Sequence, residues 1–201
     1  MDRRWRRAHR TAPTLQVSAG YALLASLAIA LSLVLRDGLP WVHPAPWIPM
    51  GIGVGLLSSA LLGLALAIGM IVLTRVAVTR FRWARRLHDD LRPVARDLSL
   101  PQILLLAGLS SLGEELLFRG LLTPLLGVPL SALLFGLAHQ LKGPSRWVWA
   151  GWAMAVGAGL GAIFALTGSL VGPLLAHAVI NAVNLSYLRD HDPEPSERRP
   201  A

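Results

Sequence analysis

The sequence contains no cysteine, so it holds no disulfide, no thiolate metal site and no cysteine nucleophile. It is also poor in charge. Only 15% of its 201 residues are charged, whereas a soluble domain carries about a quarter. Hydrophobic residues make up 54% of the chain. Few charges and many apolar residues together predict a polytopic membrane protein.

Long charge-free runs recur along the chain and predict an all-α bundle of about six transmembrane helices, with the functional site inside it. The first run is too long for the apolar core of a signal peptide, which has about 7–15 residues. The fourth run is the shortest. The predicted spans are 15–35, 48–73, 101–119, 129–141, 147–166 and 170–188.

The net charge of +8 does not point to nucleic acid, because the basic residues lie between the apolar runs. Four segments hold 17 of the 19 lysines and arginines, and six spans place all four on one side. They are the head 1–10, a basic amphipathic connector 75–97, the turn 142–146 and the tail after 188. The positive-inside rule then predicts an integral protein of a bacterial plasma membrane with both termini in the cytoplasm.

Ionisable residues inside the predicted spans are few, and all lie in the second half of the chain. They are Glu114, Glu115, Arg119, His139 and His177, accompanied by the polar Asn181. Such residues are costly in a bilayer and are functional candidates. A spacing of four predicts an ion pair between Glu115 and Arg119 and a shared face for His177 and Asn181. Glu114 is rotated by about 100° from Glu115 and faces elsewhere.

Depth along the helices places three of these side chains in one layer. At ~1.5 Å per residue, Glu114, His139 and His177 fall roughly 10–15 Å from the non-cytoplasmic side of a ~30 Å core. Taken singly, a Glu–Arg tie, a packing histidine and an asparagine between helices each have an ordinary structural role. Their convergence at one depth predicts a functional site.

Three motifs carry a resemblance to a known family. They are E-E-x-x-x-R in 114–119, F-x-x-x-H in 135–139 and H-x-x-x-N in 177–181. In this order they resemble the CAAX prenyl protease and bacteriocin-processing family (CPBP, or Abi) of intramembrane proteases. The resemblance implies a catalytic membrane domain at 100–188. It is preceded at 1–99 by the basic head, two spans and the connector, and followed at 189–201 by a disordered charged tail.

The family resemblance implies an endopeptidase that hydrolyses a peptide or membrane-protein substrate within the bilayer. Glu114 would activate a water molecule, and His139 would help to hold it. His177 and Asn181 would donate to the oxyanion of the tetrahedral intermediate.

The remaining motif residues would support the site: Glu115 with Arg119 would position Glu114, and Phe135 would pack beside them. Metal use is open at this point. The candidate zinc ligands are Glu114, His139 and His177. The H-E-x-x-H pattern of many zinc proteases is missing, and a metal-free glutamate mechanism uses the same residues.

Two other functions compete with proteolysis. A non-catalytic bacteriocin-immunity or scaffold protein of the same fold would bind a peptide without cutting it, but it has no need for a base, a water holder and oxyanion donors together. A small ion or proton transporter could use Glu114 and His139 as a relay, yet that leaves His177 and Asn181 unexplained. The substrate and the oligomeric state do not follow from the sequence.

Overall fold

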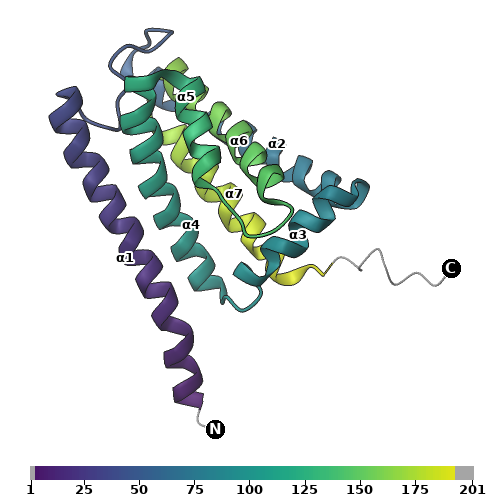
Figure 1. The fold of residues 1–201 in the computed structure, drawn as a ribbon. Coiled ribbons are helices and arrows are strands. Elements are labelled where there is room, and N and C mark those ends of the chain that lie inside the picture. Colours follow the sequence, from purple (N-terminus) through teal and green to yellow (C-terminus); the bar gives the residue numbers. More distant parts are fainter. Residues whose placement is uncertain (1–2, 193–201) are drawn as a thin grey trace.

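A computed structural model describes the backbone of residues 3–192 and the side chains of residues 15–192 as a helical bundle (Figure 1). The elements are α1 Arg3–Arg36, α2 Ile52–Arg80, α3 Arg82–Ala95, α4 Leu100–Glu115, the π-helix η1 Leu116–Leu122, α5 Thr123–Ala138, α6 Arg146–Thr167 and α7 Val171–Asp190. The predicted tail begins within α7, and its residues 193–201 lie outside the described part of the chain.

Five helical segments of the described chain are long and apolar enough to cross a membrane, and they confirm the polytopic helix bundle. The predicted third and fourth spans belong to one 39-residue segment, Leu100–Ala138. It reverses direction at Gly127, whose φ is 78° (Figure 1). The returning arm, 128–138, is about 16 Å long at 1.5 Å per residue, roughly half the thickness of the hydrocarbon core. The expected fourth span is therefore a half-length arm that buries one face, with Phe135 and Gly136, and exposes the other.

Small residues allow α2 and α7 to pack backbone against backbone. A Cβ atom at Gly63 would overlap with the backbone of Gly172, and a Cβ atom at Gly172 would overlap with the backbone of Ser59. The Ser59 hydroxyl donates to the Ser169 carbonyl at 2.8 Å and accepts from the Gly172 N–H at 2.9 Å. This crossing fixes α7, which carries two of the predicted site residues.

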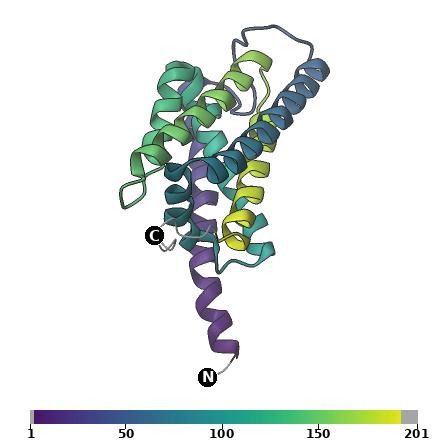
Figure 2. The same ribbon diagram turned by 90° about the vertical axis from the view of Figure 1, so that its right-hand side faces the viewer.

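The outer elements cover opposite parts of the bundle. Helix α1 lies beside α4, and its N-terminal turns extend beyond the other helices (Figure 2). The basic connector becomes the end of α2 followed by α3, which packs against α7 with Leu87 and His88 buried. At the other end, the loop 37–51 is tied to the α6–α7 turn, because the His43 N–H donates to the Gly168 carbonyl at 3.0 Å.

The α2–α7 crossing yields a stability prediction. Gly172→Ala should destabilise the fold by about 1–3 kcal/mol, because the new methyl group has no space against the Ser59 backbone. Gly69→Ala is the matched control, because Gly69 has nothing within 4 Å of its Cβ position. Thermal unfolding in detergent micelles measures both. Equal melting temperatures for the two variants would show that the close crossing does not limit stability.

Candidate active site

Glu115 lies at the centre of a buried charged network. Its Oε1 atom accepts from Arg119 Nη1 at 2.9 Å and from His177 Nδ1 at 2.7 Å. The side chains of Glu115 and Arg119 are 0% and 1% exposed, so the predicted ion pair is confirmed and fully buried. Such a pair is stable only when both partners stay in place. The network ties η1 and α7 to the last residue of α4.

Arg119 reaches Glu115 from the π-helical turn η1, where a regular α-helix was expected. The Phe118 carbonyl accepts from the Thr123 hydroxyl at 2.9 Å and from the Ser131 hydroxyl at 2.8 Å. These two hydroxyls add to the Thr123 backbone N–H, which also donates to the Phe118 carbonyl. π-Helical turns of this kind occur frequently at functional sites.

The other side of the Arg119 guanidinium faces α6 and the end of α5. Its Nη2 donates to the Gly157 carbonyl at 3.0 Å, and its Cζ lies 4.2 Å from the centre of the Phe135 ring. A Cβ atom at Gly157 would lie 2.9 Å from the Phe135 ring and 3.1 Å from Arg119. Only glycine leaves room at this point for both the ring and the cation. The Phe135 ring thus packs against the cation of the ion pair.

Glu114 points away from the ion pair, as the rotation between adjacent helical residues predicts. Its Oε2 atom lies 3.4 Å from His139 Nε2 and 3.8 Å from His177 Nε2. This oxygen is buried and has no hydrogen-bond partner among the described residues. Unsatisfied buried oxygens are rare in folded proteins. The carboxylate and both imidazoles therefore surround one small polar space.

His139 differs from its prediction in one respect. It was expected within the fourth span, but it is the residue directly after α5, with φ −89° and ψ 66°. Its Nδ1 bonds the Phe135 carbonyl at 2.8 Å. Since a carbonyl oxygen only accepts, Nδ1 carries the proton, and Nε2 is the atom that faces Glu114.

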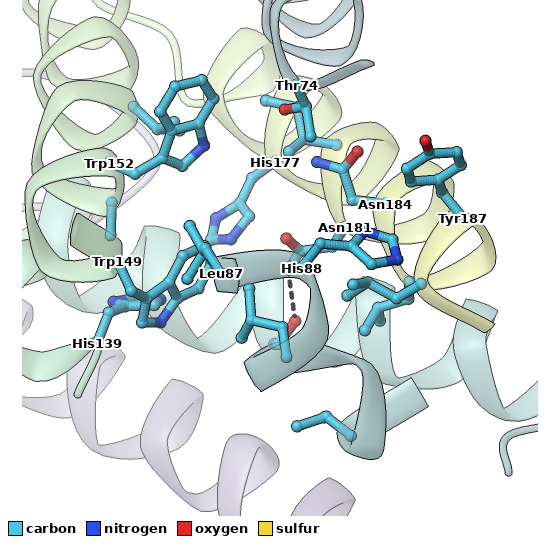
Figure 3. Close-up of a pocket in the computed structure, with 18 of the residues that line it drawn as sticks. Thr74, Leu87, His88, His139, Trp149, Trp152, His177, Asn181, Asn184 and Tyr187 are labelled. Carbon is cyan, nitrogen blue, oxygen red and sulfur yellow. Dashed lines mark hydrogen bonds between the residues drawn. The ribbon is translucent and has the colours of Figure 1, made fainter. Parts of the chain in front are cut away.

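His177 and Asn181 lie one turn apart on α7 and border the same cavity (Figure 3). One amide hydrogen of Asn181 goes to the Ser110 hydroxyl at 3.1 Å. The second amide hydrogen is left for another acceptor. The Nε2 atom of His177 is likewise available for another partner, because Nδ1 is bonded to Glu115.

A cavity of about 340 Å³ joins these residues to α3. Its walls are mainly apolar, with Leu87 from α3 and Trp149 and Trp152 from α6. His139 and His177 lie at one end and Tyr187 at the other (Figure 3). Largely apolar cavities with a few convergent polar groups are typical of ligand sites. The polar site thus forms part of a cavity that α3 of the basic connector helps to wall.

Two residues at this site were missed by the sequence interpretation. Tyr21 of α1 and Ser110 of α4 both line the cavity. Tyr21 is the single aromatic residue in an otherwise aliphatic first span, and Ser110 precedes Glu114 by one helical turn. The lone tyrosine and the serine one turn before Glu114 can both be seen in the sequence. Neither shows which helices pack against each other.

The candidate zinc ligands come close together but do not form a metal-binding cluster. Within residues 15–192, no group of three His, Cys, Asp or Glu side chains is arranged to hold a metal ion. The contacts of 3.4 and 3.8 Å from Glu114 to the two histidines are those of neighbouring polar groups.

The buried network yields a prediction that separates the adjacent glutamates. Glu115→Ala should lower the free energy of unfolding by about 3–5 kcal/mol, because it leaves Arg119 buried without its carboxylate. Glu114→Ala removes a carboxylate that has no arginine partner and should cost far less. Thermal unfolding of the two purified variants provides the comparison. A Glu115→Ala variant as stable as Glu114→Ala would mean that the ion pair does not hold the site together.

Comparison with known proteins identifies the family. Residues 96–183, which carry all three motifs, match the family described as type II CAAX prenyl endopeptidase Rce1-like. The chain is also 30% identical over 130 residues to the uncharacterized protein YpbD of Bacillus subtilis (strain 168), covering 63% of this chain and 67% of that protein. No solved structure gives a significant match. The chain belongs to the CPBP family of membrane proteases, within which it is similar to the Rce1-like endopeptidases.

Proposed function

We propose that this protein is an intramembrane endopeptidase in which Glu114 activates a water molecule for attack on a peptide bond. One observation carries the proposal: a buried, unpartnered carboxylate oxygen of Glu114 faces the Nε2 atoms of His139 and His177 across a few ångströms. An oxygen in this position needs a donor, and a water molecule supplies one. Membership in a family of membrane proteases supports the same reaction class.

The hydrogen bonds around the site restrict the protonation states of the histidines. His139 donates through Nδ1 to Phe135, so its neutral form presents an Nε2 lone pair. A water molecule between Glu114 and His139 then gives one hydrogen to each of them. His177 also donates through Nδ1, to Glu115. To donate from Nε2 as well, His177 must be an imidazolium.

This set of protonation states balances the buried charge. Glu114 and Glu115 contribute two negative charges, whereas Arg119 and the His177 imidazolium contribute two positive charges. A neutral total matters in the bilayer interior, where each uncompensated charge costs several kcal/mol. The same assignment places a positive charge where the oxyanion would form.

The reaction then follows from these groups. Glu114 takes a proton from the water as its oxygen attacks the scissile carbonyl carbon. His177 Nε2 and the free amide hydrogen of Asn181 donate to the resulting oxyanion. The protonated Glu114 passes its proton to the leaving nitrogen, and the C–N bond breaks. Each proton removed from water thus reaches a product, and the carboxylate is regenerated.

The cavity supports an apolar substrate segment. Its walls carry leucine and tryptophan side chains from α3 and α6, and Glu114 is one of the residues that line it. A segment that enters from the α3 side would bring its peptide bond to the Glu114 carboxylate. The family description points to CAAX-box proteins as the first substrates to test.

Orientation in the membrane is also a proposal. By the positive-inside rule, the basic α2–α3 junction and the α5–α6 turn lie on the cytoplasmic side, so α3 would cover the cavity from that side. Single introduced cysteines report the orientation, because the native chain contains no cysteine. Arg86→Cys and Lys142→Cys should resist an impermeant thiol reagent in intact cells, whereas Asp37→Cys should react. All three native side chains are exposed. The opposite labelling pattern would invert the orientation.

Glu114→Gln tests the proposed base directly. The substitution keeps size and polarity but removes the proton acceptor, so turnover should fall by roughly two or more orders of magnitude with stability unchanged. A quenched fluorescent farnesylated CAAX peptide in proteoliposomes gives the rate. A comparison of membrane-protein termini between wild-type and variant cells extends the test beyond that one peptide. If the Glu114→Gln variant turns over within a few-fold of wild type, Glu114 is not the base. If the wild-type protein cleaves nothing in either assay, a non-catalytic binder is favoured.

The same preparations test the alternative of a zinc ion on Glu114, His139 and His177. We expect wild-type turnover to survive chelators and the purified protein to hold no stoichiometric zinc. Loss of activity with a chelator, restored by zinc, together with loss of bound zinc in His177→Ala, would make these residues metal ligands.

A further inference from the structure

The cavity beside the active site contains an arginine, Arg75, that the proposed reaction does not use. Among the described residues that line this cavity, Glu114 is the only aspartate or glutamate and Arg75 is the only arginine or lysine. Arg75 lies in the last two turns of α2 and precedes the family-matched segment 96–183. None of the three family motifs therefore accounts for a cation at this position.

The half-buried guanidinium of Arg75 is held in place by α7. Its Nη1 donates to the side-chain oxygen of Asn184 at 3.0 Å, and its Nη2 donates to the Val183 carbonyl at 3.2 Å. Its Cζ lies 3.6 Å from the centre of the Tyr187 ring. A charged group that is already ordered loses less conformational entropy when it binds a ligand. The geometry is therefore suited to binding as well as to packing.

The same contacts leave the positive charge of Arg75 without an anion. Its three partners on α7 are neutral groups, and no aspartate or glutamate pairs with it within residues 15–192. A guanidinium has five N–H groups, of which these contacts use two. A tie between α2 and α7 alone would not need a charge, because a neutral donor also satisfies an amide oxygen and a carbonyl. A planar guanidinium with free N–H groups matches the two oxygens of a carboxylate.

The separation between Glu114 and this cation suits the end of a peptide. His177 Nε2 lies 3.8 Å from Glu114, and Asn184 follows His177 by seven residues on α7. Both residues border the cavity, with Asn181 between them (Figure 3). Seven helical residues rise about 10 Å, and an extended peptide covers that distance in about three residues. A terminal carboxylate at Arg75 would thus leave a peptide bond a few residues earlier beside Glu114.

We propose that Arg75 forms a carboxylate-binding subsite: its guanidinium donates to the C-terminal carboxylate of the substrate and thereby sets which peptide bond lies at Glu114. This proposal rests on the proposed function, because it takes the ligand of the cavity to be a peptide. It makes α2 part of the substrate site and selects substrates with a free C-terminus close to the scissile bond. A substrate with a blocked or distant C-terminus would lose this contact.

Binding to the Glu114→Gln variant tests the subsite without turnover. The probe is a fluorescein-labelled farnesylated CAAX peptide, made as the free acid and as the C-terminal amide. Its fluorescence anisotropy is measured with the protein in nanodiscs, and empty nanodiscs give the background. The free acid should bind roughly 10–100-fold more tightly than the amide, as expected for hydrogen bonds between charged groups. Equal affinities for the acid and the amide overturn the proposal.

A lengthened peptide tests the position of the carboxylate without any change to Arg75. The free acid extended by two glycines should bind no more tightly than the amide, because its carboxylate lies beyond the guanidinium. An extended acid that binds as tightly as the original acid would show a general attraction of anions to the basic connector. That result also overturns the proposal.

Arg75→Gln, made in the Glu114→Gln background, tests the residue itself. It should remove the preference for the acid over the amide and leave the affinity for the amide within about twofold. Arg80→Gln is the matched control, because Arg80 is an exposed residue of the same helix that does not line the cavity. The control should keep the full preference. A preference that survives Arg75→Gln, or that Arg80→Gln lowers equally, overturns the proposal.

Arg75→Lys decides the question if Arg75→Gln binds neither peptide. Lysine keeps the charge but lacks the planar fork of the guanidinium, so the preference for the acid should be smaller than with Arg75. An unchanged preference in Arg75→Lys would then overturn the proposal.

Cleavage of the acid and amide peptides by the wild-type protein separates this subsite from the proposed function. We expect kcat/KM to be at least about tenfold higher for the acid. If both peptides are cleaved with equal kcat/KM, the endopeptidase stands and the subsite is overturned. If the acid binds more tightly but neither peptide is cleaved, the proposed function fails, whereas the binding data still support a carboxylate site at Arg75.

Discussion

A single carboxylate oxygen, Glu115 Oε1, accepts hydrogen bonds from both Arg119 and His177 and thereby joins the end of α4, the turn η1 and the first half of α7. Burying this network in a bilayer protein is tolerable only because each charge has an opposite partner. Because adjacent helical residues are rotated by about 100°, Glu114 turns away from Arg119 and faces His139 and the Nε2 atom of His177. The adjacent glutamates therefore have different neighbours: Glu115 contacts Arg119 and His177 Nδ1, whereas Glu114 faces His139.

The arrangement also explains why the proposed chemistry needs three separate helices. Glu114 comes from α4, His139 from the end of the half-length α5, and His177 with Asn181 from α7. Two parts of the site are also fixed by contacts outside it: α7 by its crossing at Ser59, and Arg119 of η1 by the Gly157 carbonyl. The proposed hydrolysis requires water to be confined, and Glu114 lines a cavity that has mainly apolar walls from α3 and α6.

Sequence spacing was enough to predict the parts of the site that depend on one helix at a time. The Glu115–Arg119 pair and the shared face of His177 and Asn181 follow from positions four apart. Other features depend on contacts between helices. The π-turn is supported by Thr123 and Ser131, and α5 ends at residue 138 rather than running on as a span. The close approach of Tyr21 to α4 requires the missing side chain at Gly113, which no periodicity reveals.

The most direct test of a water-activating glutamate is a single turnover in ¹⁸O-labelled water with protein in excess over a cleavable peptide. If Glu114 acts as a base, the attacking oxygen comes from water, so we expect the new carboxylate of the product to carry one ¹⁸O atom after the first turnover. Mass spectrometry of the product and of the protein reads the label. A product that holds only ¹⁶O, with the label found on Glu114, would show that the carboxylate itself attacked the peptide and would contradict general-base catalysis.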